Sequence, residues 1–399
     1  MSSLEPGSYR ASTLTDEAAL VQALLRTEVA WLYALAAAGI LKPEQVAAAE
    51  QSIAAVSLRL DAHAVEGAGN PVPALLDIVR AAVEDPDVAD LVHKGLTSQD
   101  TLDTALMLIA GDVLDRVGSA LKETASKLAR LADDHRTSVM AGRTLTQHAV
   151  PVTFGLKAAQ WLVGVVDAAD AVAAVGRALP VQCGGAAGTL SLAGDLVSDP
   201  TQLAADFAQR LGLTWPGLPW HTRRTPITRL GDVLVEVLDA LGKVATDVLV
   251  LGRPEIAEVR EGLADGRGGS STMPHKRNPV LAVLVHSAAL QAPQLAAQLH
   301  LCAAHSIDER SDGAWHAEWP ALQRLMSLAV VATAQAAELV LSLEVDVGVM
   351  RRRVRDSSTD LLAERRRQDP GDAASHLGAA HAFIDAALHR FRERSAGDG

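Results

Sequence analysis

The sequence has few aromatic residues, few cysteines and few segments of the kind that form strands. Phe, Tyr and Trp make up 3% of the 399 residues, and runs that alternate β-branched or aromatic residues with polar ones are scarce. The two cysteines, Cys183 and Cys302, lie far apart and have no Cys-x-x-Cys or Cys/His spacing. This excludes a disulfide framework and a zinc motif. We therefore expect a mostly helical chain without a metal, in a reducing cytoplasm.

Signals for membranes, export and nucleic acid are also missing. No eighteen consecutive apolar residues occur, and the N-terminal segment lacks a basic start followed by an apolar stretch. The net charge of -12 opposes binding to nucleic acid, which needs a basic face. We expect a soluble protein with no nucleic acid and no membrane among its partners. A small anionic substrate is compatible with this charge because it needs only a few local cations.

Long apolar stripes are what the sequence does contain. Large apolar residues recur at steps of three and four within residues 114–131, 230–251 and 322–343, which is the pattern of a helix with one buried face. Alanine and other small residues between them suit close packing in a helical bundle. The sequence therefore predicts an all-α fold built on long helices, with apolar surface left over for other subunits.

A flexible cationic loop interrupts these helix-forming segments. The stretch GSSTMPHKRNPV begins at Gly269, and the glycines at 266, 268 and 269 make the backbone ahead of Ser270 permissive. Such a loop carries a hydroxyl over a site and withdraws it again, while Lys276 and Asn278 suit a carboxylate or a phosphate. Composition alone fits a solvated, disordered loop equally well.

The stretch GSSTMPHKRNP resembles the signature loop of the fumarase/aspartase superfamily of homotetrameric lyases. The resemblance implies a long central helical bundle that assembles into a tetrameric helical core, with smaller N- and C-terminal helical domains. It places these three domains at residues 1–106, 107–345 and 346–399, with the signature loop at 262–280. It further implies an enzyme without cofactor or metal, whose active sites are each shared by three subunits of a homotetramer.

The same resemblance assigns roles to the residues of the loop and of a second stretch. Ser270 would remove a proton next to a carboxylate, and Lys276 and Asn278 would hold the substrate carboxylates and the carbanion-like intermediate. The stretch HKGLTSQDTLDTAL starts at residue 93 and resembles the first short region of the family. Within it His93, Thr97 and Ser98 would bind substrate. Read alone, the same stretch is a helix N-cap.

Two further stretches complete the implied site. GRTLTQHAVPVTFGLKAAQWL, from residue 142, resembles the second region, in which Thr144 and Gln147 would bind substrate. IDERSDGAWHAEWPAL resembles a later segment that contributes a substrate-binding arginine, here Arg310. By itself Arg310 also fits a surface ion pair.

Within the superfamily the chain resembles the bacterial 3-carboxy-cis,cis-muconate cycloisomerases. The stretches LPVQCGGAAGTLS, PWHTRRTPI and GAWHAEWPAL carry this likeness. It implies interconversion of a small tricarboxylate, 3-carboxy-cis,cis-muconate, and 4-carboxymuconolactone, a step of protocatechuate and β-ketoadipate catabolism. After residues 343–346 the family usually continues into a longer third helical domain, of which residues 376–391 resemble the final helix.

Adenylosuccinate lyase is the main alternative, and two positions argue against it. In adenylosuccinate and argininosuccinate lyases a histidine after GRT donates a proton, and a glutamate seven residues beyond the loop lysine orients it. Leu145 and Val283 occupy these positions here. Loss of both members of the pair favours the cycloisomerase, because a carboxylate leaving group is a weak base that departs without strong protonation.

His148 is a candidate replacement for the missing acid. It lies three residues after Leu145, so on a helix it would share roughly the same face about one turn along, and imidazole exchanges protons near neutrality. A structural or carboxylate-binding histidine fits the sequence equally well. A non-catalytic scaffold of the same fold is the remaining alternative, and the intact Ser270, Lys276 and Asn278 argue against it.

Overall fold

The computed structural model confirms a nearly all-helical chain. It describes residues 3–56, 59–264, 266–269, 272, 273, 276–365 and 373–397. Five helices of 23 to 37 residues supply most of the central structure. They are α7 (Ser98–Asp134), α8 (Phe154–Gly176), α11 (Thr225–Leu251), α12 (Val280–Ala304) and α13 (Gly313–Leu341).

The apolar stripes read from the sequence form the buried faces of three of these helices. The stripe in α11 is buried throughout, from Leu230 to Leu251. The stripes at residues 114–131 and 322–343 fall in α7 and α13, except that Leu343 begins the short strand β4 (Leu343–Val345). Leu343 leaves the helix because it pairs with Glu261 in the antiparallel strand β3 (Val259–Glu261).

The chain divides into two compact units, each described here by itself. Unit 1 comprises residues 1–115, 173–232 and 294–327, and unit 2 comprises residues 116–172, 233–293 and 328–399. The unit boundaries fall inside the five long helices. The three domains expected from the sequence stay a prediction.

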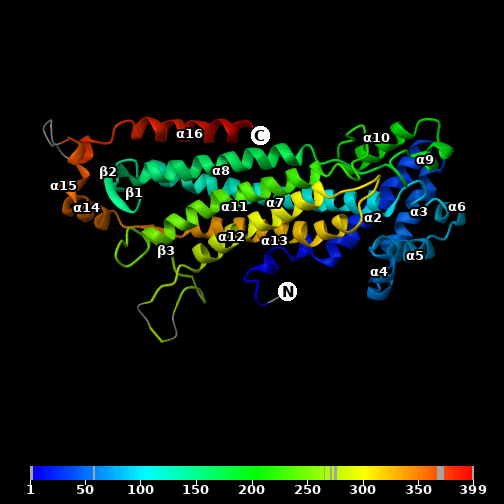
Figure 1. Ribbon diagram of the computed structural model, residues 1–399, viewed down its shortest axis with the longest axis horizontal. Coiled ribbons are helices and arrows are strands. Elements are labelled where there is room, and N and C mark those ends of the chain that lie inside the picture. Colours follow the sequence, from blue (N-terminus) through cyan, green and yellow to red (C-terminus); the bar gives the residue numbers. More distant parts are fainter. Residues whose placement is uncertain are drawn as a thin grey trace. The chain divides into compact units, whose positions relative to one another are not determined.

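Unit 1 also contains one helix of 21 residues and several short ones (Figure 1). They are η1 (Ser8–Arg10), α1 (Ser12–Thr15), α2 (Glu17–Ala37), α3 (Pro43–Ala54), α4 (Ala62–Ala68), α5 (Val72–Ala82), α6 (Pro86–Ala89), α9 (Ser191–Leu196) and α10 (Pro200–Leu211). The Asp16 side chain caps α2 by accepting a hydrogen bond from the backbone N–H of Ala19. Trp31 of α2 meets Phe207 of α10 edge to face, with ring centroids 5.4 Å apart. These contacts fix α2, which faces the candidate site described below.

Unit 2 adds a hairpin and the C-terminal elements. The hairpin pairs β1 (Val139–Thr144) with β2 (Gln147–Thr153). The C-terminal elements are α14 (Val347–Asp356), α15 (Ser358–Leu361), η2 (Ala363–Arg365), η3 (Ala373–Ser375) and α16 (Ala380–Gly397). Figure 1 shows α16 (red) running alongside α8, and Arg390 forms ion pairs with Asp167 and Asp170 of that helix.

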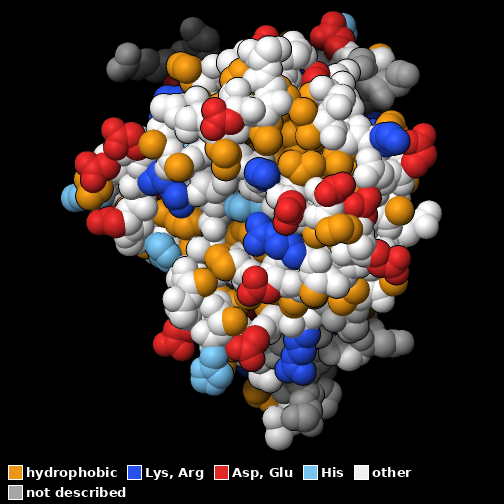
Figure 2. Space-filling view, turned by 90° about the vertical axis from the view of Figure 1, so that its right-hand side faces the viewer, with side chains coloured by type: hydrophobic (Ala, Val, Ile, Leu, Met, Phe, Trp, Pro, Cys, Tyr) orange, Lys and Arg blue, Asp and Glu red, His pale blue; other side chains and the backbone are white. Residues whose placement is uncertain are grey.

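Charges of both signs are mixed on the surface. On the face shown in Figure 2, Lys and Arg side chains (blue) alternate with Asp and Glu side chains (red) among hydrophobic ones. The described residues on this face therefore form no continuous basic patch of the kind that nucleic acid requires.

Candidate functional site

The first predicted region lies at the start of α7, in unit 1. Ser98 is the first residue of the helix, so Thr97 stands at the N-cap position. The backbone N–H of Thr97, however, donates to the carboxylate of Asp100 at 3.0 Å. The Thr97 and Ser98 hydroxyls make no hydrogen bond to any described residue, and both side chains are half-buried. The helix end is thus capped without using these hydroxyls, which stay free to donate to a bound carboxylate.

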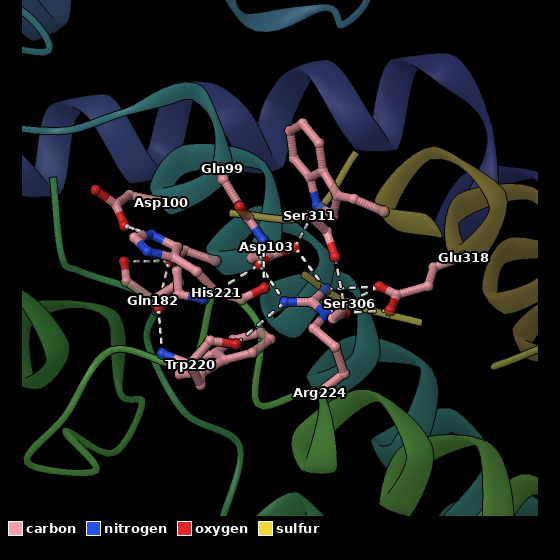
Figure 3. A network of polar contacts seen from close by, with 12 residues as sticks. Gln99, Asp100, Asp103, Gln182, Trp220, His221, Arg224, Ser306, Ser311 and Glu318 are labelled. Carbon is pink, nitrogen blue, oxygen red and sulfur yellow. Dashed lines mark hydrogen bonds and ion pairs between the residues drawn. The ribbon is translucent and has the colours of Figure 1, made fainter. Parts of the chain in front are cut away.

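Asp100 joins three segments that are distant in sequence. Besides Thr97, its buried carboxylate accepts a hydrogen bond from the Gly185 N–H at 2.8 Å and lies 2.7 Å from Nε2 of His221 (Figure 3). At Gly184 an added Cβ would approach the His221 ring to 2.8 Å, so only glycine allows this loop to pass so close. One carboxylate therefore fixes the beginning of α7, the glycine-rich loop and the loop that carries His221.

A second buried cluster lies one helical turn further along α7. Arg224 lies between Asp103 and Glu318 in Figure 3, at 2.6 Å from an oxygen of Asp103 and 2.7 Å from an oxygen of Glu318. The Nε1 of Trp315 also donates to Asp103, at 3.0 Å. Burial raises the pKa of Glu318, and Arg224 opposes that rise. Two carboxylates share one guanidinium here, which binds α7 to α13 and to the loop before α11.

His93 occupies the turn that leads into α7. Its Nδ1 lies 2.8 Å from Oε1 of Glu28 in α2, and 13% of the side chain is exposed. His93, Thr97 and Ser98 thus lie close together in unit 1, and their role in substrate binding stays a prediction. Arg310 lies in the loop before α13 in the same unit. It is half-buried and forms no ion pair with the described residues, so its interpretation as a surface ion pair finds no support.

The second predicted region is a β-hairpin, and the helical spacing expected between Leu145 and His148 is wrong. Leu145 and Thr146 form the turn with φ of 48° and 68°, and His148 pairs with Arg143 across the strands. The turn forms because β1 and β2 run antiparallel with two residues between them. In a strand, neighbouring side chains alternate between faces, so His148 and Gln147 point to opposite sides.

The tip of this hairpin is exposed. Thr144, Leu145, Gln147 and His148 are all exposed, and the His148 side chain makes no hydrogen bond to a described residue. Behind the tip, Arg143 donates two hydrogen bonds to the buried carboxylate of Glu258, at 2.9 and 3.1 Å. The contact between Arg143 and Glu258 therefore holds the hairpin in place behind its tip, where polar side chains are exposed.

The signature loop lies between β3 and α12 in unit 2, and Ser270 falls outside the described residues. The backbone N–H of Asn278 donates to the Gly268 carbonyl at 2.8 Å, which closes the loop at its base. Glu261 accepts hydrogen bonds from the N–H groups of Leu281 and Ala282 and thereby caps α12.

Two predicted substrate-binding residues stand in the described part of this loop. Lys276 is exposed and Asn278 is half-buried, and neither side chain bonds to a described residue. Within unit 2, no hydrogen bond or ion pair between described residues joins this loop to the tip of the hairpin. The loop and the hairpin tip are thus two separate sets of polar groups.

Several buried charged residues escaped the sequence analysis. Asp100, Asp103, Arg224 and Glu318 lie within the stretches whose resemblance was noted, but nothing local marks them as partners. Their separations, such as 121 residues between Asp103 and Arg224, explain this. The usable signal was a charged residue inside a helical segment, which applies to Glu318 of α13 but not to Arg224 in the loop before α11. Among the described residues, no group of three or more His, Cys, Asp or Glu side chains is arranged to hold a metal ion.

Comparison with known proteins adds a family and several relatives. The lyase family profile matches residues 12–293. A nitrosuccinate lyase from Streptomyces davaonensis is 46% identical over 361 residues, which cover 88% of this chain and 76% of the relative. A 3-carboxy-cis,cis-muconate cycloisomerase from Bradyrhizobium diazoefficiens is 38% identical over 354 residues, covering 88% of this chain and 78% of the relative.

A solved structure confirms the expected fold. The crystal structure of the 3-carboxy-cis,cis-muconate lactonizing enzyme from Pseudomonas putida superposes with a TM-score of 0.84 at 31% identity and covers 94% of each chain. The resemblance to the fumarase/aspartase superfamily and the fumarase-like helical fold are therefore both confirmed.

Proposed function

We propose that this chain, which belongs to the lyase family of the fumarase/aspartase superfamily, catalyses β-elimination of a weakly basic anion from a small polycarboxylate, or the reverse addition. A base removes a proton from the carbon next to a carboxylate, and the electron pair forms a carbon–carbon double bond. The bond to the leaving group breaks, and the anion takes its electrons. The names of the relatives and the free hydroxyls of Thr97 and Ser98 support this class of reaction.

The observation that carries the choice of leaving group is the pair Leu145 and Val283. Both stand where related lyases have the acid and its orienting carboxylate, and neither side chain donates or accepts a proton. An amine or an alkoxide needs a proton in order to leave, whereas nitrite and carboxylate are stable anions near neutral pH. The pair therefore favours substrates that release an anion of this kind.

Two substrates meet this requirement. Nitrosuccinate releases nitrite and yields fumarate. It is the first candidate substrate because the lyase named for it is 46% identical to this chain. The lactone of 3-carboxymuconate releases a tethered carboxylate. This lactone is the second candidate substrate, because the cycloisomerase relative is 38% identical and the lactonizing enzyme shares the fold.

The proposed roles follow the family pattern. Ser270 removes the proton, and Lys276, Asn278, Thr97, Ser98, Thr144 and Arg310 bind carboxylates and stabilise the aci-carboxylate intermediate by fixed charges and hydrogen bonds. The side chains of Lys276, Asn278 and Arg310 make no ion pair or hydrogen bond to a described residue. They are therefore available for an anion.

We further propose that the active form is a homotetramer whose sites combine regions from three subunits. The helix α12 supports this, since it is apolar over its length but only 33% of its most apolar window is buried. Val283, Leu290 and Leu301 lie on one face of α12 and are 51 to 66% exposed. Their spacing of seven and eleven residues gives a continuous stripe for a neighbouring helix.

A substrate panel tests the proposal. Purified protein is mixed separately with nitrosuccinate, 3-carboxy-cis,cis-muconate and adenylosuccinate, and nitrite release, loss of diene absorbance and fumarate formation are followed. We expect turnover of nitrosuccinate or of the muconate. Turnover of adenylosuccinate alone, whose leaving group is an amine, would overturn the argument from Leu145 and Val283.

A further inference from the structure

A cavity of about 400 Å³ lies within unit 1. Its lining comes from α1, α2, α4, α7, α13 and the loop after α4, and it contains none of the predicted substrate-binding residues. The buried part of the lining consists of apolar side chains of α7 and α13, which are Leu102, Leu106, Ile109 and Met326. Exposed residues, among them Ala62 and Gly69, line it as well. The cavity is therefore apolar inside and open to solvent.

One face of α13 holds two segments of this lining in place. His316, Trp319 and Gln323 follow one another at steps of three and four, so they share a face of the helix. Nε2 of His316 donates to the Gly69 carbonyl at 2.9 Å, and Nε2 of Gln323 donates to the Thr15 carbonyl at 2.6 Å. The loop after α4 and the end of α1 are thus both tied to α13, on either side of Trp319.

Trp319 lines the cavity with an indole N–H that has no partner. Its Nε1 atom is buried and makes no hydrogen bond to a described residue. The polar side chains of four other lining residues, Thr15, Asp16, Asn70 and Gln323, each bond to the backbone. Since a buried donor without an acceptor costs free energy, an acceptor for Trp319 is what the cavity lacks.

The other buried indoles show that the chain usually supplies such an acceptor. Each of them donates from Nε1 to an oxygen of the protein at 2.7 to 3.0 Å, namely Trp31, Trp161, Trp220 and Trp315. Trp315 lies one turn before Trp319 on the same helix, and its acceptor is the buried carboxylate of Asp103. Trp319 therefore differs from its neighbour in facing a cavity in place of a protein oxygen.

The lining also defines the charge and the size of a ligand. Its charged side chains are the carboxylates of Asp16 and Glu17, and no Lys, Arg or His is among the described residues that line it. Such a cavity opposes an anion, so it does not suit the polycarboxylate of the proposed function. Because an apolar cavity of about 150 Å³ holds benzene, this one takes roughly fifteen heavy atoms.

We propose that this cavity is a second ligand site, which binds a neutral, largely apolar molecule that accepts a hydrogen bond from Nε1 of Trp319. The apolar body of the ligand packs against the buried side chains of α7 and α13, and an oxygen such as that of a ketone satisfies the indole. No bond is made or broken. The inference goes beyond the proposed function and does not depend on it.

The test measures binding of two probes to the full chain by equilibrium dialysis. The first, 2-acetylnaphthalene, is a neutral aromatic ketone, and the second, naphthalene-2-carboxylate, has the same ring system with a negative charge. We expect a Kd below about 1 mM for the ketone and binding at least about tenfold weaker for the carboxylate. An excess of succinate, a small dicarboxylate, should change the Kd of the ketone by less than about twofold.

Two variants locate the probe. Trp319→Phe removes the donor and should weaken binding of the ketone about fivefold to tenfold. Trp215→Phe is the matched control, because Trp215 is half-buried in the loop after α10 and does not line the cavity. It should leave the Kd within about twofold of the wild type. Val65→Trp fills the cavity from the half-buried side of α4 and should weaken binding about tenfold or more, which keeps the test decisive if Trp319→Phe fails to fold.

Four results would overturn the inference. They are no binding of the ketone at about 1 mM, binding of the carboxylate as tight as that of the ketone, displacement of the ketone by succinate, and an unchanged Kd in folded Trp319→Phe or Val65→Trp. None of them bears on the proposed function, which the substrate panel tests separately.

Discussion

At the scale of single residues, Arg224 is expected to stabilise the fold because it lies buried between two carboxylates. Its guanidinium is the only cation that contacts both Asp103 and Glu318 among the described residues. Removing one partner of a buried ion pair leaves charges uncompensated and costs about 3–5 kcal/mol. We therefore expect Arg224→Met to lower the free energy of unfolding by about this amount, measured by chemical denaturation.

Arg310→Met is the matched control, because Arg310 is half-buried and has no ion pair to a described residue. It should change the free energy of unfolding by less than about 0.5 kcal/mol while lowering activity, as expected for a substrate-binding residue. An Arg224→Met protein as stable as the wild type would contradict the account of this cluster.

A second residue-scale prediction concerns pH and His135, at the C-terminal end of α7. Burial lowers the pKa of His135, with Asp134 opposing, and the ring packs edge to face on Phe154. The unfolded chain then binds a proton that the folded chain rejects, so stability falls as pH drops below the ordinary histidine pKa of about 6.5.

We expect His135→Asn to lose less stability than the wild type when the pH is lowered from about 7.5 to 5.5. Denaturation curves at the two pH values measure this difference. Ser138→Ala controls for the contact between Ser138 Oγ and His135 Nδ1, at 3.1 Å, and should keep the pH dependence of the wild type. A His135→Asn protein with the same pH dependence would show that His135 is not the responsible group.

At the scale of secondary-structure elements, the β1–β2 hairpin is the clearest place to raise the free energy of unfolding by substitution. Its turn places Leu145 and Thr146 at positive φ, where Asn and Gly are favoured. The double variant Leu145→Asn, Thr146→Gly should therefore raise the free energy of unfolding by about 1 kcal/mol. Thermal and chemical denaturation would measure the gain, and a loss of stability would contradict the assigned turn.

The same hairpin is an element that could not be predicted from the sequence. The stripes of α11 and α7 were predictable because burial of one helix face repeats locally every three to four residues. The turn at Leu145 has neither of its usual residues, so no local cue distinguished the hairpin from a helix. The family resemblance identified His93, Thr97 and Ser98 as candidate substrate-binding residues. The contact of His93 with Glu28 spans 65 residues and emerges only when α2 and α7 pack together.

At the scale of the whole molecule, the exposed stripe of α12 makes the proposed tetramer testable. Leu290 lies in the middle of that stripe and is 66% exposed. A charge there would be buried without a partner on assembly. We therefore expect Leu290→Asp to form assemblies smaller than a tetramer, as measured by light scattering. It should also lose activity, because each proposed site needs three subunits.

Leu218→Asp is the matched control, since Leu218 is 68% exposed in the loop that follows α10. It should assemble and act like the wild type. An active tetramer of Leu290→Asp would place the subunit contact elsewhere.

The central claim is that the enzyme expels a weakly basic anion from a carbon next to a carboxylate. The most direct measurement quantifies nitrite and fumarate released from nitrosuccinate by the wild type and by Ser270→Ala. The account predicts equal amounts of the two products from the wild type and a fall of at least a hundredfold in rate for a folded Ser270→Ala. Nitrite release without an equal amount of fumarate, or a Ser270→Ala rate near that of the wild type, would contradict it.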